Sequence, residues 1–198
     1  TNDLSYEYAE ANLEDTSILI MNTNKKRELA DSKYNERRAE CDKALELLKA
    51  QKEINFLCDL TVDEFNKISH VLTDDVLYRR AKHAIHENER VQLAIEALAS
   101  GDLNQFGTLL NQSHQSLRDD YEVTGKELDT IVELAWAQNG VLGARMTGAG
   151  FGGCAIALVE NEALEDVKEA ITKGYKEMIG YEADLYVATI GDGTKTLA

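Results

Sequence analysis

The segment RMTGAGFGGC, residues 145–154, places four glycines within six positions and runs directly into the apolar stretch AIALV. Glycine tolerates positive φ and close backbone approach, so the segment predicts a tight connection between two short strands, GARMT and CAIALV. Consecutive amides in such a loop could also point into one concavity and bind an anion. The lysine of a GxxxxGK[ST] phosphate loop is missing, and a strand follows in place of a helix. The residues alone therefore leave two interpretations open, a packing hairpin and a loop that faces a site.

Further strands and amphipathic helices flank this hairpin. SILIMN at 17–22 is typical of a buried strand, and ADLYVATI at 183–190 is expected to close the fold as another. Helical spacing of apolar residues predicts helices over 32–50, 62–72, 77–98, 102–117, 124–138 and 161–179. Apart from a helical insert, the order is strand, helix, strand, strand, helix, strand. This order predicts an α+β fold, a ferredoxin-like split βαβ sheet with a large helical insertion in its first crossover.

Local signals predict where several helices begin and end. Thr61-Val-Asp-Glu64 and Thr124-Gly-Lys-Glu127 both have the spacing of a capping box, so each is expected to begin a helix. Gly101 is expected to end the longest helix. In the helix at 32–50, one stripe is expected to form the apolar face and begins in the first turn; its members are Tyr34, Arg38, Cys41, Leu45 and Leu48.

Composition argues against several classes of partner. The 198 residues include 36 acidic side chains against 21 Lys and Arg, a net charge of −15, so neither nucleic acid nor a membrane surface is expected as a partner. Cys41, Cys58 and Cys154 form no CxxC pair and are odd in number, so we expect a reducing, cytoplasmic location. The length favours one domain over residues 1–198. Because the chain starts at Thr1, we expect a processed or partial sequence.

Three segments resemble the GHMP kinases, and within them the galactokinases. RMTGAGFGGCAIALV resembles the third motif of the GHMP kinases, a glycine-rich hairpin in their C-terminal domain. NTNKKRELADSKYNERRAEC at 22–41 and SHQSLRDDYEVTGKELD at 113–129 resemble galactokinase segments. The three occur in order and cover nearly the whole chain, which therefore resembles the C-terminal half of a galactokinase. The YNERR and SLRDDYEV segments favour this group over the mevalonate and N-acetylgalactosamine kinases.

The resemblance implies an activity for the intact protein, the ATP-dependent phosphorylation of the 1-hydroxyl of α-D-galactose with Mg²⁺. The family's phosphate loop, and the aspartate and arginine beside the sugar, belong to the N-terminal half, and no stretch here matches them. We therefore expect no catalytic residue in this chain, the protein's own N-terminal domain as its partner, and no activity of the chain alone. A non-catalytic galactose-sensing relative that acts through a partner protein stays open, as does a ferredoxin-like binding module of other ancestry.

The same resemblance indicates site residues. It implies that Tyr34 hydrogen-bonds the sugar, whereas the residues alone favour a tyrosine in the core. It also implies that the glycine motif lines the active-site cleft, through Thr147, Gly148, Ala149, Gly150, Phe151, Gly152 and Gly153. Lys25, Lys26 and Arg27 form a local basic cluster. This cluster is either a solvated loop or a site where Lys26 or Arg27 offsets the charge of the triphosphate.

Other polar residues are expected to have structural roles. His83, His86 and Glu87 do not have the HExxH spacing, and His114 lies alone in a polar segment, so we expect solvated or capped histidines. Cys154 opens a strand and is expected to act as a small apolar residue. If half of the protein is missing here, the surface that faced it should be apolar and concave and should favour self-association, and we expect it at the sheet edge near the third motif and Tyr34.

Overall fold

The computed structural model describes residues 8–13, 15–25 and 30–188. The strands are β1 (Thr16–Asn22), β2 (Val141–Thr147), β3 (Cys154–Glu160) and β4 (Asp184–Ala188). The α-helices are α1 (Ala30–Lys49), α2 (Val62–Ile68), α3 (Asp75–Ala99), α4 (Leu103–Asp119), α5 (Lys126–Trp136) and α6 (Leu164–Ile179). Short 3₁₀ turns occupy Leu57–Asp59, Ser69–Val71 and Asn161–Ala163. The elements agree with those predicted from periodicity.

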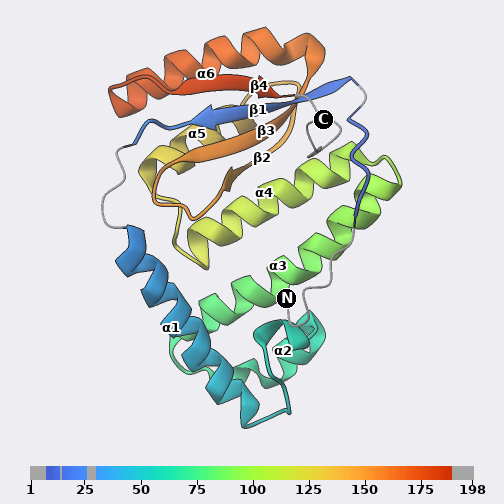
Figure 1. Ribbon diagram of the computed structural model, residues 1–198, viewed down its shortest axis with the longest axis vertical. Coiled ribbons are helices and arrows are strands. Elements are labelled where there is room, and N and C mark those ends of the chain that lie inside the picture. The colour runs from blue at the N-terminus through green and yellow to red at the C-terminus, as the bar shows by residue number, and fades with distance from the viewer. Residues whose placement is uncertain (1–7, 14, 26–29, 189–198) are drawn as a thin grey trace, which may run out of the picture.

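The four strands form one antiparallel sheet in the order β2-β3-β1-β4. Strands β1 and β2 run in the same direction with β3 between them, and β3 and β4 do so with β1 between them. Each pair is joined by a crossover that contains helices, so the predicted split βαβ topology is confirmed. Helices α1 to α4 form the predicted insertion. Helix α4 packs against β2, and α1, α2 and α3 lie farther from the sheet (Figure 1).

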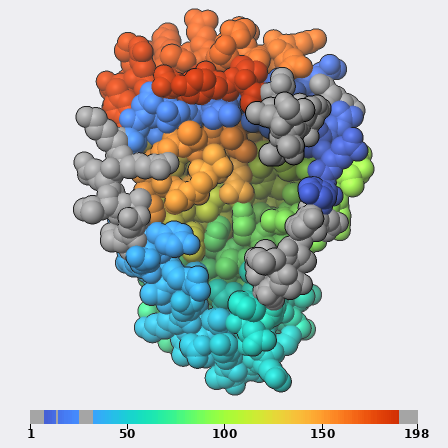
Figure 2. Space-filling model, viewed as in Figure 1, coloured from blue at the N-terminus to red at the C-terminus, as the bar shows by residue number. Residues whose placement is uncertain are grey.

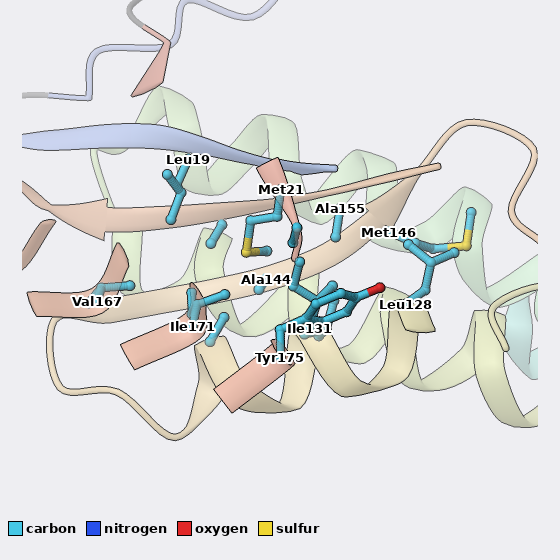
Figure 3. Packing of buried hydrophobic residues seen from close by; sticks show 14 of the residues in the cluster. Leu19, Met21, Leu128, Ile131, Ala144, Met146, Ala155, Val167, Ile171 and Tyr175 are labelled. Carbon is cyan, nitrogen blue, oxygen red and sulfur yellow. The ribbon is translucent and has the colours of Figure 1, made fainter. Parts of the chain in front are cut away.

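One hydrophobic core lies between the sheet and helices α5 and α6. Alternate residues of β1 point into it, because side chains of a strand alternate between the two faces of the sheet. Leu19 and Met21 are fully buried there, and Met21 pairs in register with Ala155. Figure 3 shows side chains of the sheet and of both helices meeting, among them Ile131 of α5 and Ile171 of α6.

A second hydrophobic cluster lies within the insertion. It includes the fully buried Leu48, Phe65 and Ile85 from α1, α2 and α3. Along α1 this cluster reaches only from Cys41 to Leu48. The prediction that Tyr34 belongs to the apolar stripe of this helix is therefore wrong, because the first turns of α1 extend past the cluster.

One predicted capping box is confirmed and one is wrong. The Thr61 hydroxyl accepts the Glu64 N–H at 3.2 Å, and the Glu64 carboxylate accepts the Thr61 N–H at 3.0 Å. At Thr124 no box forms, because α5 begins one residue later with Gly125 as its N-cap at φ 88°. The Glu127 carboxylate that would close the box is paired with Lys25 instead.

Candidate functional site

The glycine-rich loop joins β2 to β3 in a conformation that needs its glycines. Positive φ angles occur at Gly148 (85°), Gly150 (82°), Gly152 (109°) and Gly153 (86°), and also at Phe151 (58°). Residues other than glycine rarely adopt positive φ angles. The glycine density of the motif is therefore a backbone requirement of this turn.

The α4–α5 connection holds the middle of the loop. The Phe151 N–H donates to the carbonyl oxygen of Val123 at 2.7 Å. A Cβ added at Gly150 would lie 2.0 Å from the same oxygen, closer than any side chain tolerates. The close approach of these two backbone segments therefore depends on Gly150.

The end of β1 holds the last part of the loop. The backbone N–H and the hydroxyl of Thr23 both donate to the carbonyl oxygen of Gly153, at 2.9 and 2.8 Å. The aliphatic chain of Lys25 crosses Gly152, where a Cβ would lie 2.9 Å from its Cδ atom, and its ammonium pairs with Glu127 at 2.8 Å. Residues 150–153 are thus fixed on two sides.

The first part of the loop is open in contrast. Thr147, Gly148 and Ala149 are exposed, and a Cβ added at Gly148 would meet nothing within 4 Å. The loop therefore has a fixed half and an accessible half. Its rigid end can hold the backbone of the accessible half in place for contact with a ligand.

Tyr34 lies on the first turns of α1, beside this loop. Its neighbour Lys33 places its ammonium 5.3 Å from the centroid of the Phe151 ring, a cation–π contact. Tyr34 itself is 60% exposed, so the interpretation as a core tyrosine is wrong. The structure brings the turn that carries Tyr34 next to the glycine loop, and a sugar contact through its hydroxyl stays a prediction.

Sequence reasoning missed Lys33 and did not resolve the basic cluster. A single lysine in a helical turn carries no local sequence signal. The cation–π contact of Lys33 can be recognised only once the fold places Phe151 beneath it. Lys25 forms an ion pair with Glu127. Lys26 and Arg27 lie outside the described residues, so their predicted electrostatic role stays a prediction.

A hollow of about 350 Å³ opens beside Thr147, between α3, α4 and the sheet. Glu87 lines it and binds the Ser113 hydroxyl, Arg90 and, at 3.2 Å, Arg145. Burial alone would raise the pKa of Glu87, but the Ser113 hydrogen bond and the two arginine charges outweigh it and lower this pKa. The carboxylate therefore stays ionised and ties α3 to β2 next to the loop.

Two of the histidines, His83 and His114, have buried structural partners. The buried His83 contacts the Ser116 hydroxyl at 3.0 Å and stacks on Tyr121, with ring centroids 4.5 Å apart. Burial lowers the pKa of His83 to about 4. His114 is fully buried and not solvated, and its Nδ1 atom accepts the Met146 N–H. Among the described residues, no three His, Cys, Asp or Glu side chains are grouped to hold a metal ion.

The sheet face opposite the core is apolar near its centre. Ile20 pairs in register with Ile156 on one side and with Tyr186 on the other, so the three side chains point to the same face. Tyr186 is 55% exposed, and the two isoleucines are half-buried. Figure 2 shows β4, β1 and β3 side by side at the surface. The contact surface predicted at the sheet edge near the third motif and Tyr34 stays a prediction, and this apolar face lies at the centre of the sheet instead. In the described part of the chain, no helix has the length and apolarity to cross a membrane.

Comparisons with known proteins identify close relatives. A model of the family described as GHMP kinases C terminal matches residues 94–177. The chain is 59% identical over 196 residues to a galactokinase of Clostridium perfringens (strain SM101 / Type A), covering 99% of this chain and 51% of the relative. It is 55% identical over 197 residues to a galactokinase of Lactiplantibacillus plantarum, covering 100% and 51%.

A solved structure agrees with these matches. The structure of Lactococcus lactis galactokinase complexed with galactose superposes with a TM-score of 0.94 at 50% identity, covering 99% of this chain and 50% of that one. The chain thus spans about half the length of the curated relatives it matches.

Proposed function

Since this chain belongs to the GHMP kinase family and corresponds to the C-terminal half of the galactokinases, we propose that the whole protein transfers the γ-phosphoryl group of ATP to the 1-hydroxyl of galactose. The observation that carries the proposal is the 59% identity to a galactokinase over 99% of the chain. The working location is the cytoplasm, where ATP is available.

The part of this chain is to complete a cleft. Tyr34 presents an exposed phenol, both donor and acceptor, which suits a sugar hydroxyl. The accessible residues Thr147, Gly148 and Ala149 contribute a wall beside it, and residues 150–153 keep that wall rigid. Preorganised positioning is a main source of rate in phosphoryl transfer, because the protein does little covalent chemistry there.

The glycine loop lines the nucleotide site but is not the main phosphate-binding element. Gly148 leaves open space for close backbone approach, but the nearby Lys25 ammonium is already paired with Glu127. ATP supplies the phosphoryl group when bound. The main ligands of its triphosphate and of Mg²⁺ belong to the other half of the protein. This chain orients the sugar and supports the nucleotide loops.

The apolar sheet face around Ile20, Ile156 and Tyr186 supports a docked N-terminal half. Burial of such a face stabilises association, and its exposure in the isolated chain would favour self-association. Because the cleft needs both halves, the isolated chain is expected to be inactive.

The test is an assay of the full-length protein with ATP, Mg²⁺ and galactose, with formation of galactose 1-phosphate followed by ³¹P NMR. We expect turnover of galactose, and slower turnover of N-acetylgalactosamine and mevalonate. The isolated 198 residues serve as the matched control and should give none. Binding of galactose without turnover by the full-length protein would instead favour the sensing relative, and turnover by the isolated chain would refute the shared cleft.

A further inference from the structure

We propose that Arg80 is a positioning residue, which holds the segment Asp120–Val123 and, through it, the glycine loop at the proposed cleft. The catalytic consequence rests on the proposed function. The structural step does not, and it can be measured separately.

Arg80 lies in α3 and is almost completely buried, with 2% of its surface exposed. Its Nε atom donates to Glu40 at 2.6 Å. Its two terminal nitrogens donate to the backbone oxygen of Asp120 and to the carboxylate of Glu122, each at 2.5 Å. One guanidinium thus joins α1 and α3 of the insertion to the α4–α5 connection.

The segment that Arg80 holds has a backbone that needs support. Glu122 adopts φ 55°, a left-handed backbone conformation that residues other than glycine, asparagine and aspartate rarely populate. Arg37 donates to the carbonyl oxygens of Tyr121 and Glu122, at 2.7 and 3.3 Å. Arg79 also pairs with the Glu122 carboxylate at 3.0 Å. Three arginines from α1 and α3 therefore bind three consecutive residues of this connection, and Arg80 is the buried one.

The next residue transmits that constraint to the glycine loop. Val123 is buried, and its carbonyl oxygen accepts the Phe151 N–H and packs against Gly150. The path from Arg80 to the loop is therefore short, with Glu122 bound by the guanidinium and Val123 bound to the loop. Any shift of the Glu122 backbone therefore moves the Val123 carbonyl oxygen, which Gly150 and Phe151 contact.

An arginine is required at this position because of its geometry. The planar guanidinium directs several N–H donors at fixed angles, so it can bind Glu40, Asp120 and Glu122 at once. A lysine ammonium keeps the charge but cannot reach all three acceptors from the same backbone position. Arg80→Lys therefore tests geometry at constant charge.

The structural test is hydrogen exchange of peptides covering residues 148–153, measured by mass spectrometry in the full-length protein. We expect Arg80→Lys to speed exchange of the Phe151 amide about tenfold, with the β1–β3 ladder unchanged. Glu122→Gln, a milder variant that keeps Arg80 paired with Glu40, should speed it less. Thr61→Ala is the matched control, since it weakens α2 of the insertion without contact to the loop, and it should leave the Phe151 amide unchanged.

The functional test compares kinetic constants of the same full-length variants. Arg80→Lys should lower kcat about tenfold and leave the KM for galactose within twofold, and Thr61→Ala should change neither. Unchanged exchange at residues 148–153, or equal acceleration throughout the β1–β3 ladder, would overturn the proposal. Faster loop exchange with unchanged kcat would overturn its catalytic part. A wild-type protein that does not phosphorylate galactose would refute the proposed function and leave the exchange result standing.

Discussion

The Nδ1 atom of His114 accepts the backbone N–H of Met146 at 3.1 Å, with both residues buried. Met146 lies in β2, an edge strand whose outer N–H groups have no strand to pair with. Helix α4 supplies the missing acceptors, since Asn111 likewise accepts the Ala144 N–H at 2.8 Å. The strand that leads into the glycine loop is thus fixed by side chains of the insertion.

Replacing His114 by Ala should lower the free energy of unfolding by about 2 kcal/mol or more, because the buried Met146 N–H loses its acceptor and a cavity forms. Urea denaturation followed by circular dichroism measures this. His70→Ala, at an exposed histidine, is the control and should cost about 0.5 kcal/mol or less. Equal losses in the two variants would contradict the role given to His114.

Gly107→Ala should destabilise the protein even though alanine is the better helix former by about 1 kcal/mol. A Cβ at Gly107 would lie 2.2 Å from the carbonyl oxygen of Leu142, so α4 must move away from β2. We expect a net loss of about 2 kcal/mol, in the range of overpacked cores. Thermal melts of the purified variants measure this, and Thr108→Ala, the exposed neighbour, should be neutral or slightly stabilising. A stabilised Gly107→Ala would show that the contact is loose.

Stability should fall as the pH drops from about 6.5 to 4, in part because of His83. Burial lowers the pKa of this imidazole from 6.5 to about 4. In that window the unfolded state binds more protons than the folded state, so protonation favours unfolding, by at most about 1.4 kcal/mol per pH unit. His83→Gln should show a shallower loss in urea titrations over this range. Parallel curves for the two proteins would contradict the assignment.

Tyr34→Phe should weaken galactose binding by the full-length protein by about 1 kcal/mol, which raises the KM about fivefold. The hydroxyl is exposed and not part of a core, so the melting temperature should not change. Tyr78→Phe, in α3 where the ring stacks on Phe65, is the control and should leave the KM unchanged. An unchanged KM in Tyr34→Phe would remove this residue from the sugar site.

Local signals in the sequence predicted the elements well. The helix expected over 77–98 is α3, Asp75–Ala99, and Gly101 adopts φ 72° after its end, as expected of a glycine that ends a helix. The Thr61 box and the tight glycine turn were predicted in the same way. These features depend on residues within a few positions of one another, so neighbouring side chains carry the information.

Tertiary structure alone decided how the candidate site is held together. Thr23 binds Gly153, Val123 binds Phe151, and Arg80 binds Asp120, all pairs distant in sequence. The tertiary structure also pairs Glu127 with Lys25, so this carboxylate cannot close the predicted Thr124 capping box. It leaves Tyr34 exposed, although the helical stripe predicted an apolar contact there. The sequence by itself determined the order of elements and the turns between them, because short-range sterics and hydrogen bonding suffice for those. Which backbone oxygen meets which amide depends on how the closed chain packs, and no periodicity within one segment encodes that.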